Sequence, residues 1–307
     1  MAEVFSARLL GPVLSTCLLF VPGVAVAVAQ VNGHVPALNA EAVLLLDTEG
    51  RTVFAKNAQL EHAPASLVKL MTLYLAFEDI EARCVTLEDP VTISHAAATT
   101  PRYRMGLRTG EVVPLRILLE GVAIASANDA AAAVAEHIGG DEDTFVRRMN
   151  AKAGELGMAT TRYANPHGLP DPAQRTNARD IGVLMGRLLR DHPEARTMLG
   201  GQTFVYRGRV YARHISLFND PGGVQALKTG FTREAGYNLA VSAWRAGQQF
   251  VMIVLGARTR YQSYLDGKKL LRYGFIEAGL RSQDEPRPHV TPTPKRPIRA
   301  RRTTTRG

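Results

Sequence analysis

Short apolar runs typical of β-strands lie near both ends of the chain, and a long block of helical patterns separates them. Residues 42–47 and 52–55 flank the turn at 48–50 and predict a β-hairpin. Strands are predicted again only after residue 200. Because the two sets of strands enclose the helices, we predict an α+β fold with an antiparallel sheet flanked by helices and a helical subdomain inserted between its strands. The predicted helices are 66–80, 113–123, 130–138, 144–156, 177–189 and 261–276, and the later strands lie within 202–211 and at 224–227, 238–244 and 250–255.

The first 29 residues differ in character from the rest of the 307-residue chain. An almost wholly apolar or small stretch follows Arg8 and ends in alternating alanine and valine. This pattern predicts a secretory signal peptide over 1–29, cleaved after Ala29 or Ala27. The alternative is an uncleaved anchor helix, since the run approaches the ~20 residues that span a bilayer. Pro12 and Pro22 within the run favour cleavage, so we expect one folded domain over residues 30–280.

Positive charge is concentrated at the carboxyl end. Eight basic and two acidic residues lie in 281–307, so +6 of the net charge of +9 belongs to this segment. Its proline and arginine content predicts a disordered tail. A nucleic-acid-binding face on the folded body is therefore not indicated. The tail is expected either to contact membrane lipid or wall polymer weakly through charge or to be solvated and dispensable.

The chain has two cysteines, and removal of the signal peptide would leave Cys84 alone. One cysteine forms no intrachain disulfide, so a disulfide-stapled scaffold is excluded. We predict that Cys84 is a buried structural thiol. Histidine, cysteine and acidic residues show no metal-ligand spacing, so neither a metal nor another cofactor is expected.

A serine and a lysine lie three residues apart where the helical pattern of residues 66–80 begins. Positions i and i+3 are neighbours on a helix surface, so Ser66 and Lys69 could share one space. A serine becomes a good nucleophile when a nearby base takes its proton, and an unprotonated lysine can be that base. The alternative is an ordinary helix start, with Ser66 as a cap and Lys69 in solvent.

Two further short motifs follow in a fixed order. Ser126-Ala127-Asn128 interrupts two alanine-rich helical patterns, and Lys228-Thr229-Gly230 ends an apolar strand-like run. Each motif is weak alone. Together with Ser66-x-x-Lys69 they form the trio typical of penicillin-binding proteins and class A β-lactamases, with Asn128 matching the asparagine of its second element.

The chain resembles the serine D-alanyl-D-alanine carboxypeptidases, which are low-molecular-mass penicillin-binding proteins. The resemblance covers about residues 37–276 and implies a β-lactamase/penicillin-binding-protein-like fold for the domain at 30–280. It also implies a location in the periplasm or cell envelope, and no oligomeric state follows from it. The flanking segments that support the resemblance are Pro64-Ala65, Asn165-Pro166-His167-Gly168-Leu169, Ala235-Gly236-Tyr237-Asn238 and Tyr273-Gly274-Phe275.

The resemblance implies roles for the first two motifs. Ser66 would attack the carbonyl between two D-alanines of a peptidoglycan pentapeptide, and Lys69 would be the general base. Ser126 would relay a proton to the leaving amine, and Asn128 would hydrogen-bond the bound peptide. β-Lactams would be inhibitors that acylate Ser66.

The third motif would bind the substrate. By resemblance, Lys228 and Thr229 would hold its terminal carboxylate, and Lys228 would also help to keep Lys69 neutral. Gly230 would allow close approach of the substrate backbone. The N–H groups of Ser66 and Phe231 would form the oxyanion hole.

Other functions remain open from the sequence. A class A β-lactamase needs a glutamate-held water, and no convincing Glu-x-x-Leu-Asn segment lies between Asn128 and Lys228. A D,D-endopeptidase acting on cross-links could use the same site, and a wall-binding protein without catalysis is the third alternative. Many members of the resembled family carry a second β-rich domain and an amphipathic membrane helix, and we expect no such anchor in the Pro- and Arg-rich tail.

Several neighbouring residues have ordinary structural explanations. Asp129 is expected to be a helix N-terminal charge, and His167 to make a structural hydrogen bond. Arg233, Arg258 and Arg260 follow the third motif and are expected to be surface residues, with assistance in carboxylate binding as the alternative.

Overall fold

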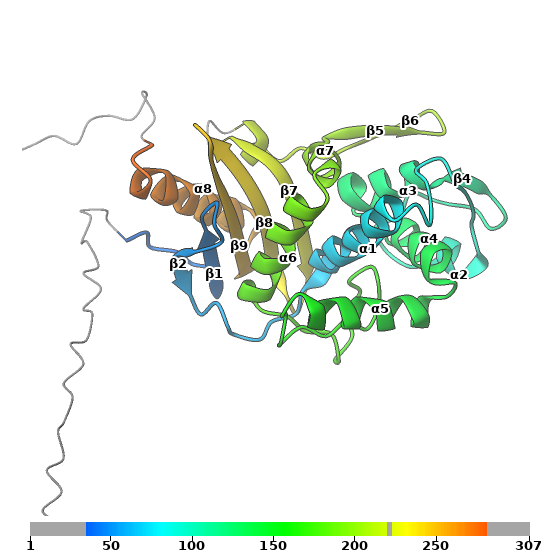
Figure 1. Ribbon diagram of the computed structural model, residues 1–307, viewed down its shortest axis with the longest axis horizontal. Coiled ribbons are helices and arrows are strands. Elements are labelled where there is room, and N and C mark those ends of the chain that lie inside the picture. Colours follow the sequence, from blue (N-terminus) through cyan, green and yellow to red (C-terminus); the bar gives the residue numbers. More distant parts are fainter. Residues whose placement is uncertain (1–34, 220–222, 281–307) are drawn as a thin grey trace, which may run out of the picture. The chain divides into compact units, whose positions relative to one another are not determined.

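The computed structural model describes residues 35–219 and 223–280 (Figure 1). The predicted signal peptide at 1–29 and the predicted tail at 281–307 lie outside the described residues. Among the described residues, no helix combines the length and apolarity needed to cross a membrane.

The five-stranded sheet is assembled from both ends of the chain. Strands β1 (Ala42–Leu46) and β2 (Thr52–Lys56) form the amino-terminal hairpin, and β1 pairs antiparallel with β9 (Gln248–Ala257). The strand order is β2-β1-β9-β8-β7, with β8 at Gly236–Arg245 and β7 at Val224–Thr232. All pairings are antiparallel, which confirms the predicted α+β class.

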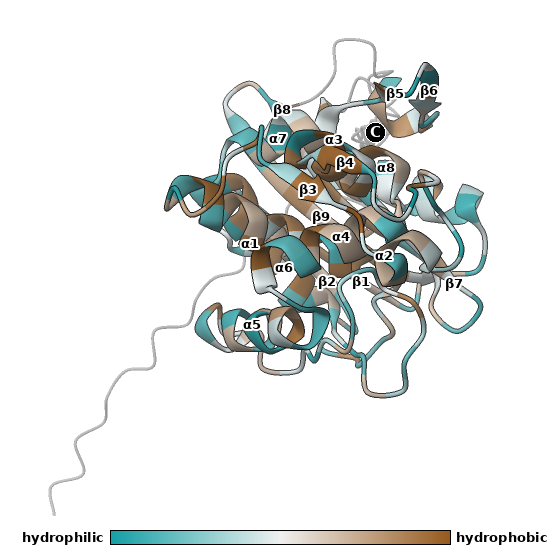
Figure 2. Cartoon of the chain, turned by 90° about the vertical axis from the view of Figure 1, so that its right-hand side faces the viewer, coloured by the Kyte–Doolittle hydropathy of each residue, from teal (hydrophilic) through white to brown (hydrophobic). Residues whose placement is uncertain are grey.

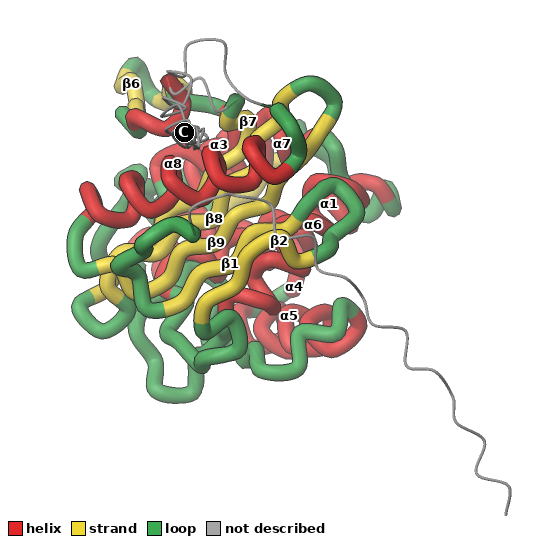
Figure 3. The backbone as a smooth tube through the Cα atoms, turned by 90° about the vertical axis from the view of Figure 1, so that its left-hand side faces the viewer, coloured by secondary structure: helices red, strands yellow, loops and turns green. Residues whose placement is uncertain are grey.

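The central strands are apolar on both faces because helices cover both. On β1, Val43 and Leu45 pack with α8 (Arg260–Glu277), whereas Leu44 and Leu46 face the opposite layer. Side chains alternate between the faces of a strand, so this arrangement follows from the period of two. Helix α8 lies across one face of the sheet in Figure 3, and α6 (Ala178–Asp191) packs on the other through Gly182, whose Cα faces Leu44 and Ile253.

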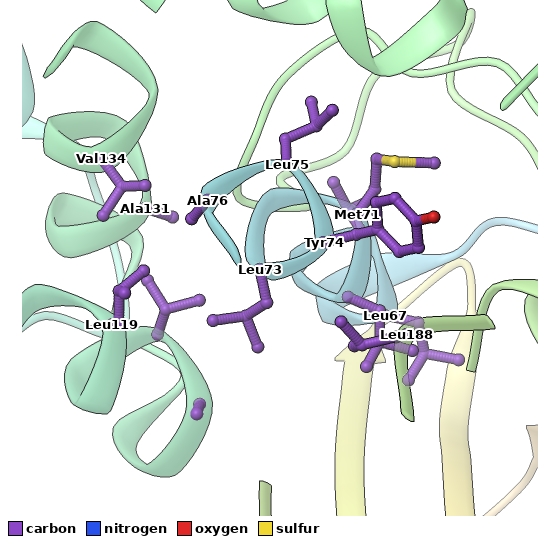
Figure 4. Close-up of a cluster of buried hydrophobic side chains, with 14 of the residues drawn as sticks. Leu67, Met71, Leu73, Tyr74, Leu75, Ala76, Leu119, Ala131, Val134 and Leu188 are labelled. Atoms are coloured by element: carbon purple, nitrogen blue, oxygen red, sulfur yellow. The ribbon is translucent and has the colours of Figure 1, made fainter. Parts of the chain in front are cut away.

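Helix α1 (Lys69–Glu81) is the core of the helical subdomain. Its residues 69–77 are all buried, so it is surrounded on every side. Figure 4 shows Leu73 and Ala76 directed toward Leu119 and Val134, which belong to α3 (Leu115–Glu120) and α4 (Asn128–Gly139). The outer helix α5 (Glu142–Glu155) carries hydrophilic residues on its exposed turns in Figure 2.

The shorter elements connect these layers and include several that the sequence pattern did not predict. No element is predicted between 81 and 112, but this region contains the strand β3 (Pro90–Thr92) and the helix α2 (His95–Thr99). The remaining elements are η1 (Ala65–Val68), β4 (Val112–Pro114), η2 (Gly121–Ala125), α7 (Glu194–Gly200), β5 (Thr203–Tyr206), β6 (Arg209–Ala212) and η3 (Ser216–Asn219).

Two boundaries differ from the prediction in ways that concern the motifs. The predicted helix at 66–80 begins as the 3-10 turn η1, and regular α-helix starts only at Lys69. The strand predicted at 224–227 continues through Lys228-Thr229-Gly230 to Thr232, because antiparallel pairing with β8 extends to that point.

The prediction that Cys84 is buried was wrong, since the thiol is exposed. Its backbone N–H closes the carboxyl end of α1 by donating to Asp79 O at 2.9 Å. The end of α1 leaves the core at this point, and Cys84 follows it into solvent.

Candidate active site

Ser66 lies in η1, which is clamped between the sheet and a loop of the helical subdomain. The Asn238 side chain on β8 donates to the carbonyls of Ala63 and Pro64 at 2.9 and 3.2 Å. On the other side, Gly168 packs so closely that a Cβ atom there would lie 2.1 Å from Ala65 O. Ala65 itself has a φ of +48°, a conformation that a non-glycine residue holds only where its surroundings impose it. The backbone that carries Ser66 is therefore rigidly positioned.

Lys69 is fully buried, and its ammonium nitrogen has three oxygen neighbours. The Nζ atom lies 2.7 Å from Asn128 Oδ1 and 3.2 Å from Ser66 Oγ, and it also donates to the carbonyl of His167. A neutral amine has two N–H bonds and one lone pair. Because Asn128 Oδ1 and His167 O are acceptors only, they take the two N–H bonds and leave the lone pair for the Ser66 hydroxyl. The geometry therefore suits Lys69 as the base that receives the Ser66 proton.

The electrostatic environment also favours neutral Lys69. Burial lowers the pKa of Lys69 to about 7, and the charge of Asp129 opposes this by raising it. We expected Lys228 to help lower the pKa of Lys69. The pKa of Lys228 is lowered by burial first and then by the charges of Lys69 and Arg213, and because repulsion between two cations is mutual, each of the two lysines disfavours the charge of the other.

The loop at 165–170 supplies a site group that sequence reasoning missed, the backbone carbonyl of His167. The loop is fixed to α1, because Thr72 Oγ1 donates to Pro166 O at 2.6 Å. It is also fixed internally, because Gly168 N donates to Asn165 Oδ1 at 2.7 Å. The His167 ring accepts a 3.3 Å hydrogen bond from Leu169 N, as expected for a structural histidine. Burial, together with the charge of Lys69, lowers the pKa of His167 to about 3.

Ser126 is positioned by an unusual helix end. The π-helix η2 closes just before it, and Ser126 adopts a left-handed conformation with φ of +55°. Its Oγ accepts a 2.8 Å hydrogen bond from Lys228 Nζ. The second and third motifs are thus in direct contact, although 102 residues separate them.

Arg213 is a second site residue that the sequence did not reveal. Its guanidinium donates to Gly201 O, Ala123 O and Leu227 O at 2.8–3.1 Å. Burial lowers the pKa of Arg213 to about 10, so the group remains a cation at neutral pH. No local pattern marks this arginine, because its partners lie in three different segments. The partly buried Arg213 and the buried Lys228 together place two basic side chains at one end of the site.

Strand β7 is the last strand of the sheet, and its Lys228-Thr229-Gly230 segment borders η1. A Cβ atom on Gly230 would lie 3.0 Å from Ser66 N and 3.1 Å from Pro64 O. The glycine therefore allows β7 to approach the backbone of Ser66, and the close approach of a substrate at Gly230 stays a prediction. This contact brings the N–H of Ser66 beside the segment that leads to Phe231.

Two cavities meet at Ser66, Tyr103 and Phe231. The larger has a volume of about 740 Å³ and contains Ser126, Lys228 and Thr229 in its wall. The smaller has a volume of about 250 Å³ and is lined by Asn128 and the 168–170 loop. Ser66 therefore faces a continuous cleft with a strongly cationic side and a second side beside Asn128.

The structure brings together all eight residues that the sequence proposed for the site. Asp129, in contrast, has a structural role: its carboxylate accepts hydrogen bonds from Met105 N, Gly106 N and Leu107 N. Arg260 lines the larger cavity and Arg233 the smaller, whereas Arg258 lines neither. The described residues contain no group of three or more His, Cys, Asp or Glu that could hold a metal ion. The proposed site residues are Ser66, Lys69, Ser126, Asn128, Lys228, Thr229, Gly230 and Phe231.

Residues 29–259 match the family model Peptidase S11, D-alanyl-D-alanine carboxypeptidase. The D-alanyl-D-alanine carboxypeptidase DacC of Escherichia coli K12 is 33% identical over 279 residues, which are 88% of this chain and 70% of the relative. DacA of the same organism is 34% identical over 78% of this chain, which spans 62% of that relative.

Solved structures show the same similarity. Penicillin-binding protein 5 of Haemophilus influenzae superposes with a TM-score of 0.77 at 32% identity, covering 80% of this chain and 73% of that one. Penicillin-binding protein D2 of Listeria monocytogenes, in its ampicillin-bound form, gives a TM-score of 0.69 at 28% identity and covers 79% of this chain and 100% of that one.

Proposed function

The chain belongs to the D-alanyl-D-alanine carboxypeptidase family, and from this we propose that it removes the terminal D-alanine from peptidoglycan stem peptides. The observation that carries the proposal is the environment of Lys69. Its buried amine has one acceptor for each N–H, and its remaining lone pair lies beside Ser66 Oγ.

The reaction proceeds in two steps. Lys69 takes the Ser66 proton while Oγ bonds to the carbonyl carbon between the two D-alanines, and the N–H groups of Ser66 and Phe231 stabilise the oxyanion. The C–N bond then breaks, and the proton taken up by Lys69 reaches the departing amine of D-alanine through the Ser126 hydroxyl, which leaves Lys69 neutral again. Water hydrolyses the resulting ester, which frees the shortened peptide and regenerates Ser66.

The basic end of the cleft explains why the site would recognise a free carboxylate. The buried Lys228 amine donates to the Ser126 hydroxyl and the Thr229 carbonyl, and the partly buried Arg213 guanidinium donates to backbone carbonyls, so neither basic group has a carboxylate partner among the described residues. A substrate carboxylate beside Lys228 and Thr229 supplies the missing negative charge through charge-assisted hydrogen bonds. Asn128 both orients Lys69 and lines the cavity where the rest of the peptide lies.

β-Lactams are the proposed inhibitors, because they present a carbonyl and a carboxylate to the same groups. The product is an acyl-enzyme on Ser66 that hydrolyses slowly. The same proposal has three further parts. Residues 1–29 are a secretory signal, and the protein is located in the periplasm or cell envelope. Residues 281–307 are a tail that contacts anionic polymer.

Mass spectrometry of the products from a defined pentapeptide tests the function. We expect release of one D-alanine by the protein and none by Ser66→Ala, which should fold normally because Ser66 is only partly buried. Penicillin should form a covalent adduct with the unmodified protein and not with Ser66→Ala. Equal D-alanine release by Ser66→Ala would refute the mechanism, and rapid penicillin hydrolysis without an adduct would indicate a β-lactamase instead.

A further inference from the structure

Residues 101–107 form an irregular segment that few groups hold in place. The segment contains no helix or strand, and most of its residues are exposed. Within the described residues, all of its hydrogen bonds are with Asn128, Asp129 and Tyr211. These three residues therefore determine where the 101–107 segment lies.

Two of the three partners belong to the start of α4, beside the candidate site. Asn128 N donates to Tyr103 O at 2.7 Å, and Asn128 Nδ2 donates to Pro101 O at 2.9 Å. The Asp129 carboxylate accepts hydrogen bonds from three further amides of the segment at 2.9–3.2 Å. The segment is thus joined directly to the residue whose Oδ1 accepts a hydrogen bond from Lys69.

Tyr211 is the one partner of this segment, among the described residues, that lies outside α4. It is on β6, and its hydroxyl donates to Met105 O at 2.6 Å. The hairpin β5–β6 extends from α7 over the helical subdomain in Figure 1. Its base is fixed by Arg213, whose backbone N–H donates to Gln202 O and whose guanidinium donates to Leu227 O on β7, both at 2.9 Å. Tyr211 therefore connects the 101–107 segment to the strand that carries the third motif.

The ring of Tyr211 is held independently of its hydroxyl. It stacks on the Phe204 ring with the centroids 4.8 Å apart and an interplanar angle of 17°. The Arg209 guanidinium lies 4.8 Å from the centroid of the Tyr211 ring. Tyr211→Phe would keep both ring contacts and remove only the hydrogen bond to the Met105 carbonyl, so this variant isolates the contribution of that bond.

We propose that Tyr211 is a positioning residue for the acylation step. Its hydroxyl holds the 101–107 segment, and the segment holds Asn128 in the orientation in which Oδ1 meets the amine of Lys69. The Tyr211 hydroxyl forms no hydrogen bond with Ser66 or Lys69, so it acts through Asn128. This inference rests on the proposed function, in which Lys69 receives the Ser66 proton.

Rapid mixing of the full chain with a fluorescent penicillin tests the proposal, because it separates the Kd of the non-covalent complex from the acylation rate constant. Tyr206→Phe is the matched control for Tyr211→Phe. Tyr206 lies on β5 of the same hairpin and lines neither cavity, and its hydroxyl donates to Glu111 Oε1, outside the 101–107 segment. Both variants lose one partly buried hydroxyl hydrogen bond of the hairpin.

We expect Tyr211→Phe to lose about three- to tenfold in the acylation rate constant, because small misplacements near a reacting group are costly. Its Kd for penicillin should change by less than about twofold, because the ring stays in the wall of the larger cavity. Tyr206→Phe should acylate within about twofold of the unmodified protein, although both variants should unfold at lower urea concentrations. In an Asn128→Ala background, adding Tyr211→Phe should change the acylation rate constant by less than about twofold, because the route through Asn128 is already broken.

Acylation by Tyr211→Phe at the unmodified rate, or an equal loss in Tyr211→Phe and Tyr206→Phe, would overturn the proposal. A loss confined to Kd would also overturn it, because Tyr211 would then be a binding residue. Independent losses in the double variant would exclude the route through Asn128, and the two tyrosine variants decide the question where Asn128→Ala does not fold. Failure of the proposed function would look different, because the unmodified protein would then form no penicillin adduct at Ser66.

Discussion

The Nζ atom of Lys69 lies 2.7 Å from Oδ1 of Asn128, a residue 59 positions later in the chain. The amide oxygen accepts a hydrogen bond but carries no negative charge, so it orients the amine without holding its proton. Asn128 is itself fixed, because its Nδ2 donates to Pro101 O at 2.9 Å. An asparagine at this point therefore allows burial to keep the pKa of Lys69 near 7.

Asn128→Asp tests this relationship by adding a charge to the same oxygen. The unmodified protein should acylate with penicillin at a rate that rises with pH up to about 7 and then levels off, since the neutral amine is the active form. A carboxylate 2.7 Å away should raise the pKa of Lys69 by about 1–3 units, so the rising limb should move to higher pH by that amount. At pH 7 the rate should fall about tenfold or more and recover partly at pH 9.

The pH dependence of the acylation rate constant measures the effect. The control is Asn219→Asp, which adds the same charge at an exposed position outside both cavities. If the rising limb of the acylation rate lay at the same pH in Asn128→Asp, a group other than Lys69 would control the pH dependence.

Asp129→Asn should move the rising limb of the acylation pH profile to lower pH, opposite to the shift expected for Asn128→Asp. The charge of Asp129 raises the pKa of Lys69, so its removal should lower that pKa by up to about one unit. The variant should also lose about 1–3 kcal/mol of unfolding free energy, because the Asp129 carboxylate accepts hydrogen bonds from the Met105, Gly106 and Leu107 amides. Urea unfolding and the pH profile separate the two effects, and a limb displaced to higher pH would contradict the assignment.

Gly230→Ala should impair catalysis by separating β7 from η1. The new Cβ would lie 3.0 Å from Ser66 N and 3.2 Å from Ala65 Cβ, so one of the two segments must shift. A displacement of about 1 Å at a reacting group can cost about 10²-fold in rate, so the smaller shift required here, of a few tenths of an ångström, should cost up to about tenfold. We expect that loss in penicillin acylation, whereas Gly154→Ala on α5 should acylate normally because its Cβ meets nothing within 4 Å. Normal acylation by Gly230→Ala would show that the close approach is not required.

Gly168→Ala should mainly reduce stability. Its φ is +86°, and the added Cβ would lie 2.1 Å from Ala65 O. We expect a loss of about 3 kcal/mol or more in unfolding free energy, since both backbone strain and a clash contribute. Gly157→Ala separates the backbone strain from the clash, because the φ of Gly157 is +75° and its added Cβ would meet nothing within 4 Å. This control should lose only about 1–2 kcal/mol, and an equal loss in both variants would exclude the clash as the cause.

The sequence was informative where a local pattern determines structure. The β1 and β9 runs and the helix predicted at 177–189 all depend on neighbours in the chain, and each corresponds to an observed element. The strands predicted at 238–244 and 250–255 are also observed as an antiparallel pair, and Ala246 and Gly247 between them adopt the positive φ values of +48° and +81° that join two such strands. By contrast, α2 and β3 were missed because they are only five and three residues long and carry no complete period.

In the candidate site too, local sequence determines some features and tertiary contacts determine the others. The chemistry of Ser66 and Lys69 depends on residue type and a three-residue spacing, which the sequence determines. The prediction for Cys84 failed because burial depends on where α1 leaves the core, and no local signal records that.

The sequence by itself determined the antiparallel α+β fold, the order of the three motifs and the identities of the proposed reacting groups. Only the tertiary structure decided that the His167 carbonyl and Asn128 occupy the two N–H bonds of Lys69, and that Arg213 lies behind Lys228. The physical reason is that these contacts join segments 59 and 98 residues apart, and that the more distant one is made by a backbone carbonyl, which every residue has. Periodicity and residue type describe which side chains are present, whereas desolvation and the positions of acceptors around an amine exist only once the chain has folded.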